Sequence, residues 1–190
     1  MTRIAIVDPQ PAVRAGLAML LRTEPGLVPV GAAADAHDGL ELIGRVRPDV
    51  VLLERQLPEG DGISVCRRLA ARAGAPRVIL YTADPDRELT LLARVASAHG
   101  LVDKAADPGE LFEAIRIVAR GGSALPPLDV REMEAAAHLI DPEDLALLAM
   151  LVDGTAAGEV ADTLHLDRRR VSRRIERMLG RLREGATAAA

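Results

Sequence analysis

Polar side chains follow four apolar runs in the first half of the sequence. Asp8, Glu54, Thr82 and Lys104 each stand at or just after the end of a run that reads as a strand. Glu54 is the most unusual, because four apolar residues lead directly into its carboxylate. A charge at the end of a buried strand costs free energy unless it has a partner or a task. These four residues are therefore the first candidates for a site.

The elements that must position them form a regular alternation. Amphipathic helical patterns separate five short apolar runs, which lie near Arg3–Asp8, Leu27–Ala32, Asp49–Glu54, Arg77–Tyr81 and Gly100–Val102. Five β-α repeats of this length predict a doubly wound parallel sheet covered on both faces, in an α/β fold. In such sheets functional groups gather at the carboxyl ends of the strands, where the four candidates stand.

The second half of the sequence predicts a different architecture. Gly and Pro are dense around 121–127, so a linker is expected over 122–137, after an α/β domain at 1–121. Residues 138–184 read as an all-helical domain, with helices over 141–153, 156–163 and 168–183. Asp167 is expected to cap the third helix. The tail, 185–190, is expected to fray.

Within this helical part, an acidic segment is followed by a strongly basic one. Ten acids and one Arg lie between 129 and 167, whereas eight Arg and one Glu lie between 168 and 183. Apolar residues of the third helix share one stripe at helical spacing, and arginines share another. The guanidinium group of Arg can donate two parallel hydrogen bonds to phosphate oxygens or to the edge of guanine, and an α-helix fits the DNA major groove. We predict that these arginines contact double-stranded DNA: Arg168, Arg169, Arg170, Arg173, Arg174 and Arg177.

Composition excludes several other classes. The chain has 190 residues, is 49% hydrophobic and 27% charged, and has only two aromatic residues, so a site of stacked aromatics is excluded. No signal peptide and no apolar run long enough for a membrane span are visible, so a cytoplasmic protein without membrane contact is expected. Cys66 is single and predicted to be buried. The four histidines show no metal-ligand spacing and no nucleophile motif occurs, so we do not expect an enzyme.

The C-terminal part resembles the helix-turn-helix domain of NarL/LuxR-type response regulators, which are bacterial two-component transcription regulators. The matching residues are Gly154, Glu159, Val160, Ala161, Leu164, His165, Leu166, Asp167, Val171, Ile175, Met178, Leu179 and Leu182. The resemblance implies that the third helix enters the major groove, with Ser172, Arg173 and Glu176 at base-reading positions. Ala156 replaces a capping Ser, and Thr155 is expected to cap instead. The family's fourth, dimerising helix has no counterpart here, so any dimer is expected to use the N-terminal domain.

The N-terminal part resembles the receiver domain of the same proteins. The matching segments are 6–8, 47–54, 57–58, 61–62, 81–83 and 103–104. The resemblance implies a flavodoxin-like (βα)5 domain that takes a phosphoryl group on an Asp, with Mg²⁺, a Thr or Ser and a Lys beside it. Thr82 and Lys104 match that pattern.

Three positions depart from the receiver pattern. Glu54 replaces the phosphate-accepting Asp, Pro9 replaces the second of two acids, and Leu101 replaces the aromatic switch residue. Mg²⁺ usually rests on one or two carboxylates at strict distances, so Mg²⁺ binding is expected to be weak or absent and no other cofactor is expected. We predict instead that Glu54 and Lys104 form a buried pair, to which Thr82 donates a hydrogen bond.

These residues lead to one principal function and two alternatives. The principal hypothesis is a DNA-binding transcription regulator with a degenerate receiver that aspartyl phosphorylation does not control, in which Glu54 either mimics the phosphorylated state or is inert. Its control is expected to come from protein abundance, from a small molecule or protein docking on the receiver, or from dimerisation. The alternatives are an interaction partner that heterodimerises with other regulators and binds DNA poorly by itself, and a phosphorylation-competent regulator.

Overall fold

A five-stranded parallel sheet forms the centre of the N-terminal half. The computed structural model describes residues 1–190 except 59, 73 and 190. The strands run in the order β2-β1-β3-β6-β7, and their bounds are β1 Thr2–Val7, β2 Leu27–Ala33, β3 Val50–Leu53, β6 Arg77–Thr82 and β7 Gly100–Asp103. A short antiparallel pair, β4 Gln56–Leu57 and β5 Gly60–Asp61, follows β3. This order confirms the predicted flavodoxin-like, doubly wound fold.

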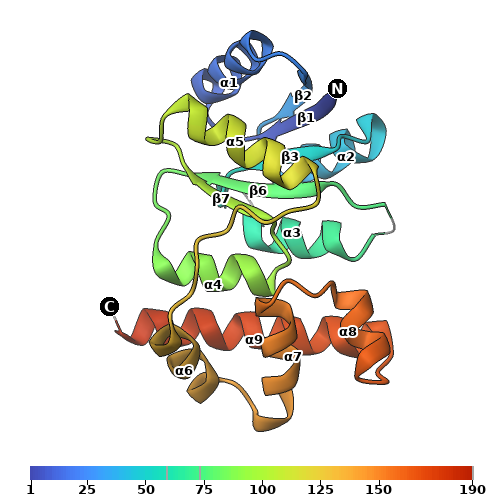
Figure 1. Ribbon diagram of the computed structural model, residues 1–190, viewed down its shortest axis with the longest axis vertical. Helices are drawn as coiled ribbons and strands as arrows, with labels where there is room; N and C mark the ends of the chain where they lie inside the picture. The colour runs from blue at the N-terminus through green and yellow to red at the C-terminus, as the bar shows by residue number, and fades with distance from the viewer. Residues whose placement is uncertain (59, 73, 190) are drawn as a thin grey trace.

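Five helices cover the two faces of this sheet (Figure 1). Helices α1 and α5 pack on one face, and α2, α3 and α4 pack on the other. Their bounds are α1 Pro11–Thr23, α2 Ala36–Val46, α3 Gly62–Ala70, α4 Arg87–Val95 and α5 Pro108–Ala119. Because both faces are covered, β3 is apolar along its length and all four of its residues are buried.

The segment expected to be a linker contains a helix. Helix α6, Val130–Leu139, begins inside the predicted linker at 122–137. A reciprocal capping box starts it: the Asp129 carboxylate accepts from the Glu132 N–H, and the Glu132 carboxylate accepts from the Asp129 N–H. Ahead of α6, Leu101 donates from its backbone to the Ala124 carbonyl, so the chain continues along the sheet edge before it leaves.

The remaining C-terminal helices follow the predicted order, with one boundary moved. A 3-10 turn, η1 Pro142–Asp144, precedes α7 Leu145–Val152, α8 Ala157–Thr163 and α9 Arg168–Ala189. Helix α9 therefore does not end near 183 with a frayed tail, as expected, but continues to Ala189; residue 190 lies outside the described part of the chain. Alanine has the highest helix propensity, so the Ala-rich end prolongs the helix.

The two halves of the molecule share a continuous buried apolar cluster. It extends from the α2–α4 face of the sheet through α4 into α6, α7, α8 and α9. In Figure 1 the long helix α9 runs beneath α4, and the two helices are in contact. Within the described residues, none of the helices combines the length and the hydropathy that a membrane crossing requires.

Candidate functional site

The sheet topology brings the four predicted polar residues together. Asp8 follows β1 and Glu54 follows β3, and these neighbouring strands flank the point where the strand order reverses. Thr82 ends β6, and Lys104 directly follows β7. The sheet also holds their backbones, because Glu54 N–H donates to the Val7 carbonyl at 2.8 Å and Lys104 N–H donates to the Thr82 carbonyl at 2.8 Å. We call these four residues the carboxylate pocket.

Lys104 lies between the two acids of the carboxylate pocket. Its Nζ is 2.6 Å from Asp8 Oδ2 and 2.5 Å from Glu54 Oε2. Asp8 is 2% exposed and Glu54 is 6% exposed, so both carboxylates are buried. Thr82 Oγ1 donates to Glu54 Oε1 at 2.9 Å. The structure thus has the predicted contacts of Glu54 with Lys104 and Thr82, and it adds Asp8 as a second partner of the ammonium.

Each carboxylate oxygen of the pocket has a partner. Besides Lys104, Asp8 accepts from the Gln10 N–H at 2.8 Å through Oδ1. Glu54 Oε1 accepts from the Gln56 N–H at 3.0 Å in addition to the Thr82 hydroxyl. Burial lowers the pKa of Lys104, but hydrogen bonds and the charges of Asp8 and Glu54 outweigh that effect and raise the pKa above its usual value. At neutral pH the ammonium is therefore charged.

Two further residues complete this region. Arg14 of α1 donates to the Asp8 carbonyl at 2.7 Å and helps to hold the β1–α1 loop. Gly62 begins α3 so close to β3 that an added Cβ would lie 2.4 Å from the Glu54 carbonyl oxygen. The Gly62 N–H donates to the Arg55 carbonyl at 2.7 Å. A glycine is therefore required where α3 meets the strand end that carries Glu54.

The donor set of the carboxylate pocket does not fit Mg²⁺. The oxygens of Asp8 and Glu54 that face each other already contact the Lys104 ammonium. Pro9, the next residue after Asp8, has no side-chain oxygen. A magnesium ion would have to displace the ammonium or the backbone donors, and it demands near-ideal octahedral geometry. Leu101, at the third departing position, is buried in the apolar cluster.

Helix α9 presents the apolar stripe that its spacing predicts. Val171, Ile175, Met178, Leu179 and Leu182 are all buried against the other C-terminal helices and α4. Asp167 caps the helix as expected, since its Oδ1 accepts from the Arg170 N–H at 2.8 Å. The arginines predicted to face outward are exposed with one exception: Arg168, Arg169, Arg170, Arg173 and Arg177 are exposed, and the first four make no ion pair with any described residue.

Arg174 was wrongly placed among the outward-facing arginines. It is 8% exposed, and its Nε donates to Asp144, which is 1% exposed. Its Nη2 donates to the Glu143 carbonyl. Arg174 lies at the border of the apolar stripe, and the turn before α7 supplies a buried carboxylate there. Its guanidinium therefore fastens α9 to α7 and is not available to DNA.

Acidic residues just before α7 also pair with arginines further along α9. Arg177 Nη2 is 3.6 Å from Asp144 Oδ2, and Arg181 Nη1 is 2.6 Å from Asp141 Oδ1. The side chain of Arg177 is still 55% exposed, so it can present part of its guanidinium to a ligand. The acidic segment and the basic helix, opposite in charge along the sequence, thus neutralise each other in part.

The base-reading side of α9 contacts the N-terminal half. Arg67 of α3 is buried, and its Nη2 donates to Ser172 Oγ at 3.4 Å. Burial lowers the pKa of Arg67, and the Glu176 charge opposes that shift. Arg183 further along α9 pairs with Asp61. Two of the three positions that the resemblance implied for base reading, Ser172 and Glu176, therefore lie beside α3.

The predicted cap of α8 is absent. Ala156 occupies the N-cap position, and the structure has no side-chain hydrogen bond there. Thr155 N–H instead donates to the Met150 carbonyl at 2.9 Å, in the turn that ends α7. Thr155 belongs to the preceding turn, because Gly154, with φ of 90°, reverses the chain one residue earlier.

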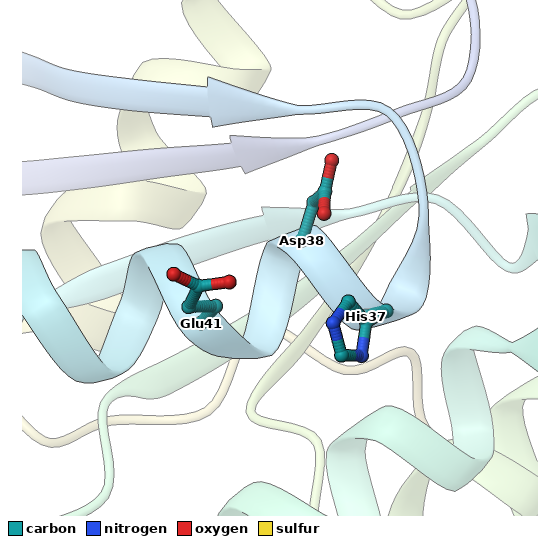
Figure 2. Close-up of side chains that lie close together, drawn as sticks. All are labelled: His37, Asp38 and Glu41. Carbon is teal, nitrogen blue, oxygen red and sulfur yellow. The ribbon is translucent and has the colours of Figure 1, made fainter.

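Three exposed residues of metal-binding types gather on α2, which the spacing of the histidines did not indicate. His37, Asp38 and Glu41 project from the first turns of α2, and their ligand atoms lie within 4.8 Å of one another (Figure 2). His37 and Glu41 are four residues apart on one helix face, which is the signal that could have found them. All three side chains are exposed, and exposed acidic groups of this kind are common without a metal ion. We interpret these three residues as ordinary solvent-exposed side chains. Cys66 is buried, as predicted.

Comparisons with known proteins agree with this geometry. Residues 4–116 match the response regulator receiver domain. The DNA-binding transcriptional activator DevR/DosR of Mycobacterium tuberculosis is 32% identical over 192 residues, which cover 96% of this chain and 88% of that protein. A LuxR-family two-component response regulator from an Aurantimonas species is 35% identical with a TM-score of 0.63, covering 67% of this chain and 91% of that one. Salmonella enterica RcsB bound to the promoter rprA covers 96% of this chain and 92% of its own at 19% identity and a TM-score of 0.62, which shows the common fold.

Proposed function

The chain belongs to the NarL/LuxR family of response regulators, and we propose that it is a DNA-binding transcription regulator whose receiver is not controlled by aspartyl phosphorylation. The proposal that aspartyl phosphorylation does not control the receiver rests on the position of Lys104. Its ammonium contacts both buried carboxylates, Asp8 and Glu54, at 2.6 and 2.5 Å. A pocket whose acids already neutralise an internal cation has little affinity left for a divalent ion.

The chemistry of Glu54 supports the same proposal. Its carboxylate is one methylene further from the strand than an Asp carboxylate, and it spans the distance to Lys104, Thr82 and the Gln56 N–H at once. In-line attack on a phosphodonor needs an unencumbered carboxylate oxygen at a fixed place. Both oxygens of Glu54 are engaged, so the residue serves to join the ends of β3, β6 and β7.

The domain arrangement favours an inert bridge over a mimic of the phosphorylated state. With Glu54 in place, Arg67 of α3 still contacts Ser172 of α9. An acid that imitated an activating phosphoryl group would be expected to separate the receiver from this helix. We therefore assign the pair of Glu54 and Lys104 a structural role, and replacement of Glu54 by Gln should leave DNA affinity within about twofold of wild type.

DNA binding is supported by the exposed arginines and by the relatives. DevR/DosR is named as a DNA-binding activator, and RcsB was solved on promoter DNA. In this chain Arg168, Arg169, Arg170 and Arg173 form an exposed basic strip along the first turns of α9. Arg67 covers Ser172, so full entry of α9 into a major groove requires α9 to separate from α3 and α4.

The phosphorylation proposal has a direct test. The full chain is incubated with a small-molecule phosphodonor and Mg²⁺, and its intact mass is measured. We expect no adduct on the wild type or on Glu54→Asp, because Pro9 still withholds the second acid. The double variant Glu54→Asp with Pro9→Asp should gain Mg²⁺-dependent labelling. A stoichiometric adduct on the wild type, or efficient labelling of Glu54→Asp alone, would overturn the proposal.

Genome-wide mapping of bound DNA tests the regulator function and supplies the target.

The contact between Arg67 and Ser172 also favours a second candidate function, in which the protein pairs with other regulators through its receiver and binds DNA poorly by itself. The two are separated by adding purified chain to genomic fragments at low salt. Binding by the chain alone supports the regulator; binding only in the presence of another regulator supports the partner.

A further inference from the structure

The contact between α3 and α9 contains a buried cation that has no ion-pair partner among the described residues. Arg67 of α3 is 7% exposed. Its Nη2 donates to Ser172 Oγ at 3.4 Å, which is long for a hydrogen bond. Its Nε and Nη1 each have less than 1 Å² of exposed area and donate to no described residue. Buried arginines are rarely left in this state, because burial of a charge costs free energy unless the charge is paired.

The nearest acid only partly compensates this charge. Glu176, four residues beyond Ser172 on α9, is exposed, and its attraction raises the pKa of Arg67. Burial has the larger effect, and the pKa of Arg67 is lowered as a result. A guanidinium is not deprotonated in proteins, so Arg67 keeps its charge in the contact.

The other polar contacts between the receiver and the C-terminal half provide acceptors. Arg94 of α4 donates from Nη1 to the Val152 carbonyl at 3.0 Å and from Nη2 to the Pro126 carbonyl at 2.6 Å. Arg183 of α9 pairs with Asp61. The apolar cluster also runs from α4 into α9. These contacts hold α9 on the receiver, which leaves the buried cation of α3 as a component that opposes them.

We propose that Arg67 weakens the contact between the receiver and α9 and so sets how readily α9 leaves the receiver. Buried donors without acceptors cost free energy, and separation of α9 from α3 returns them to water. Arg67 therefore shifts the equilibrium toward the separated form, in which the Ser172 side of α9 is free. This role is the opposite of a fastening one, although Arg67 does donate to Ser172.

Arg67→Met in the full chain distinguishes the two roles. Methionine fills a similar volume without a buried charge, and apolar replacement of buried ionic groups often stabilises a protein. We expect Tm to rise by about 2–4 °C. We also expect the affinity for genomic DNA fragments to fall about tenfold, because the separated form becomes rarer. Thermal unfolding and fluorescence anisotropy give the two values.

Arg68→Met is the matched control, because Arg68 is the exposed neighbour of Arg67 on α3. It should leave Tm within about 1 °C and DNA affinity within about twofold of wild type, as surface substitutions usually do. A lower Tm with tighter DNA binding for Arg67→Met would show that Arg67 fastens α9, and would overturn the proposal. Wild-type values of both quantities would overturn it as well.

A second variant supplies the missing acceptor. Ser172→Asp places a carboxylate opposite Arg67 and should raise Tm in the wild type by more than it does in Arg67→Met, because the new charge then has no buried partner. An equal change of Tm in the two backgrounds would mean that Arg67 does not lack a partner, and would overturn the proposal. Arg67→Gln, which removes the charge, serves as the background if Arg67→Met does not fold.

The expected change in DNA affinity rests on the proposed function, whereas the Tm values do not. A chain that binds no DNA would overturn the proposed function, and the Tm values of Arg67→Met and Ser172→Asp would then decide the role of Arg67 alone. A higher Tm for Arg67→Met with unchanged DNA affinity would uphold the weakened contact and overturn its control of DNA binding.

Discussion

The carboxylate pocket and helix α9 both contain many charged groups, but the charges are fully paired in the pocket and only partly paired on α9. In the pocket one lysine satisfies two acids, and all three groups are withdrawn from solvent. On α9 the charge is divided: Arg174 is buried with Asp144, Arg177 and Arg181 pair at the surface, and the first turns leave their arginines exposed. Charges that are paired within the protein stabilise its structure, and only the unpaired charges are available to a binding partner.

This difference separates arginines that look alike in the sequence. Arg173 and Arg174 are neighbours, yet one is exposed and the other is a buried partner of Asp144. A buried ion pair contributes little when compared with an apolar pair of the same volume, but removal of one partner leaves an uncompensated charge. Substitution of the two arginines should therefore affect different properties of the protein.

The largest effect is expected from Arg174→Ala. It leaves the Asp144 carboxylate buried without its main cation and should lower the free energy of unfolding by about 3–5 kcal/mol. Urea unfolding followed by circular dichroism measures the loss. The matched control Arg170→Ala, on an exposed position of the same helix, should change stability by less than about 0.5 kcal/mol. Equal stability of the two variants would mean that the pair of Arg174 and Asp144 does not hold α9 against the turn before α7.

Lys104→Met should have the next largest effect. It leaves Asp8 and Glu54 buried side by side without the ammonium and should lower the free energy of unfolding by about 2–4 kcal/mol at pH 7. Adding Glu54→Gln should cost less than the sum of the single changes, since the pair is already broken. Wild-type stability of Lys104→Met would contradict the structural role of the pair.

Much of the carboxylate pocket could be predicted from the sequence. Each of its residues ends or follows a strand, and a parallel sheet places such positions along one edge whatever the details of packing. The role of Asp8 as a second partner of Lys104 could not be predicted, because it depends on where the Lys104 side chain turns. Helix α6 was missed although its capping box, Asp129 with Glu132, stands in the sequence; the Gly and Pro residues before it were given more weight.

The arginine helix was predicted less well, for a physical reason. Helical spacing fixes the angle between side chains on α9, but it does not say which other elements pack around that helix. Arg174 meets Asp144 and Ser172 meets Arg67 only because of how η1 and α3 dock on it. Contacts between elements distant in the sequence carry no local signal.

Arg173→Ala is expected to weaken DNA binding without changing stability. It removes one exposed guanidinium from the proposed DNA face, so the slope of log affinity against log salt should fall by about 0.9, and affinity should fall by about 1–3 kcal/mol if Arg173 reads a base. Fluorescence anisotropy on a mapped site at several salt concentrations gives both values. Arg181→Ala, whose side chain pairs with Asp141, is the comparison and should change the slope less. A larger loss for Arg181 would mean that intramolecular pairing does not mark which arginines are available.

The smallest effect concerns alkaline pH and separates a lysine-based site from an arginine-based one. The pKa of Lys104 is raised in the folded protein, because the hydrogen bonds and charges of Asp8 and Glu54 outweigh its burial. Its contribution to stability is therefore complete below the unfolded-state value of about 10.4 and is lost as the pH rises through the higher folded-state value. Arginine does not titrate in this range, so the pair of Arg174 and Asp144 should keep its contribution. The difference in stability between wild type and Lys104→Met should shrink above pH 10.4, while that between wild type and Arg174→Ala stays constant. Parallel loss of both differences would indicate general alkaline unfolding in place of titration at the carboxylate pocket.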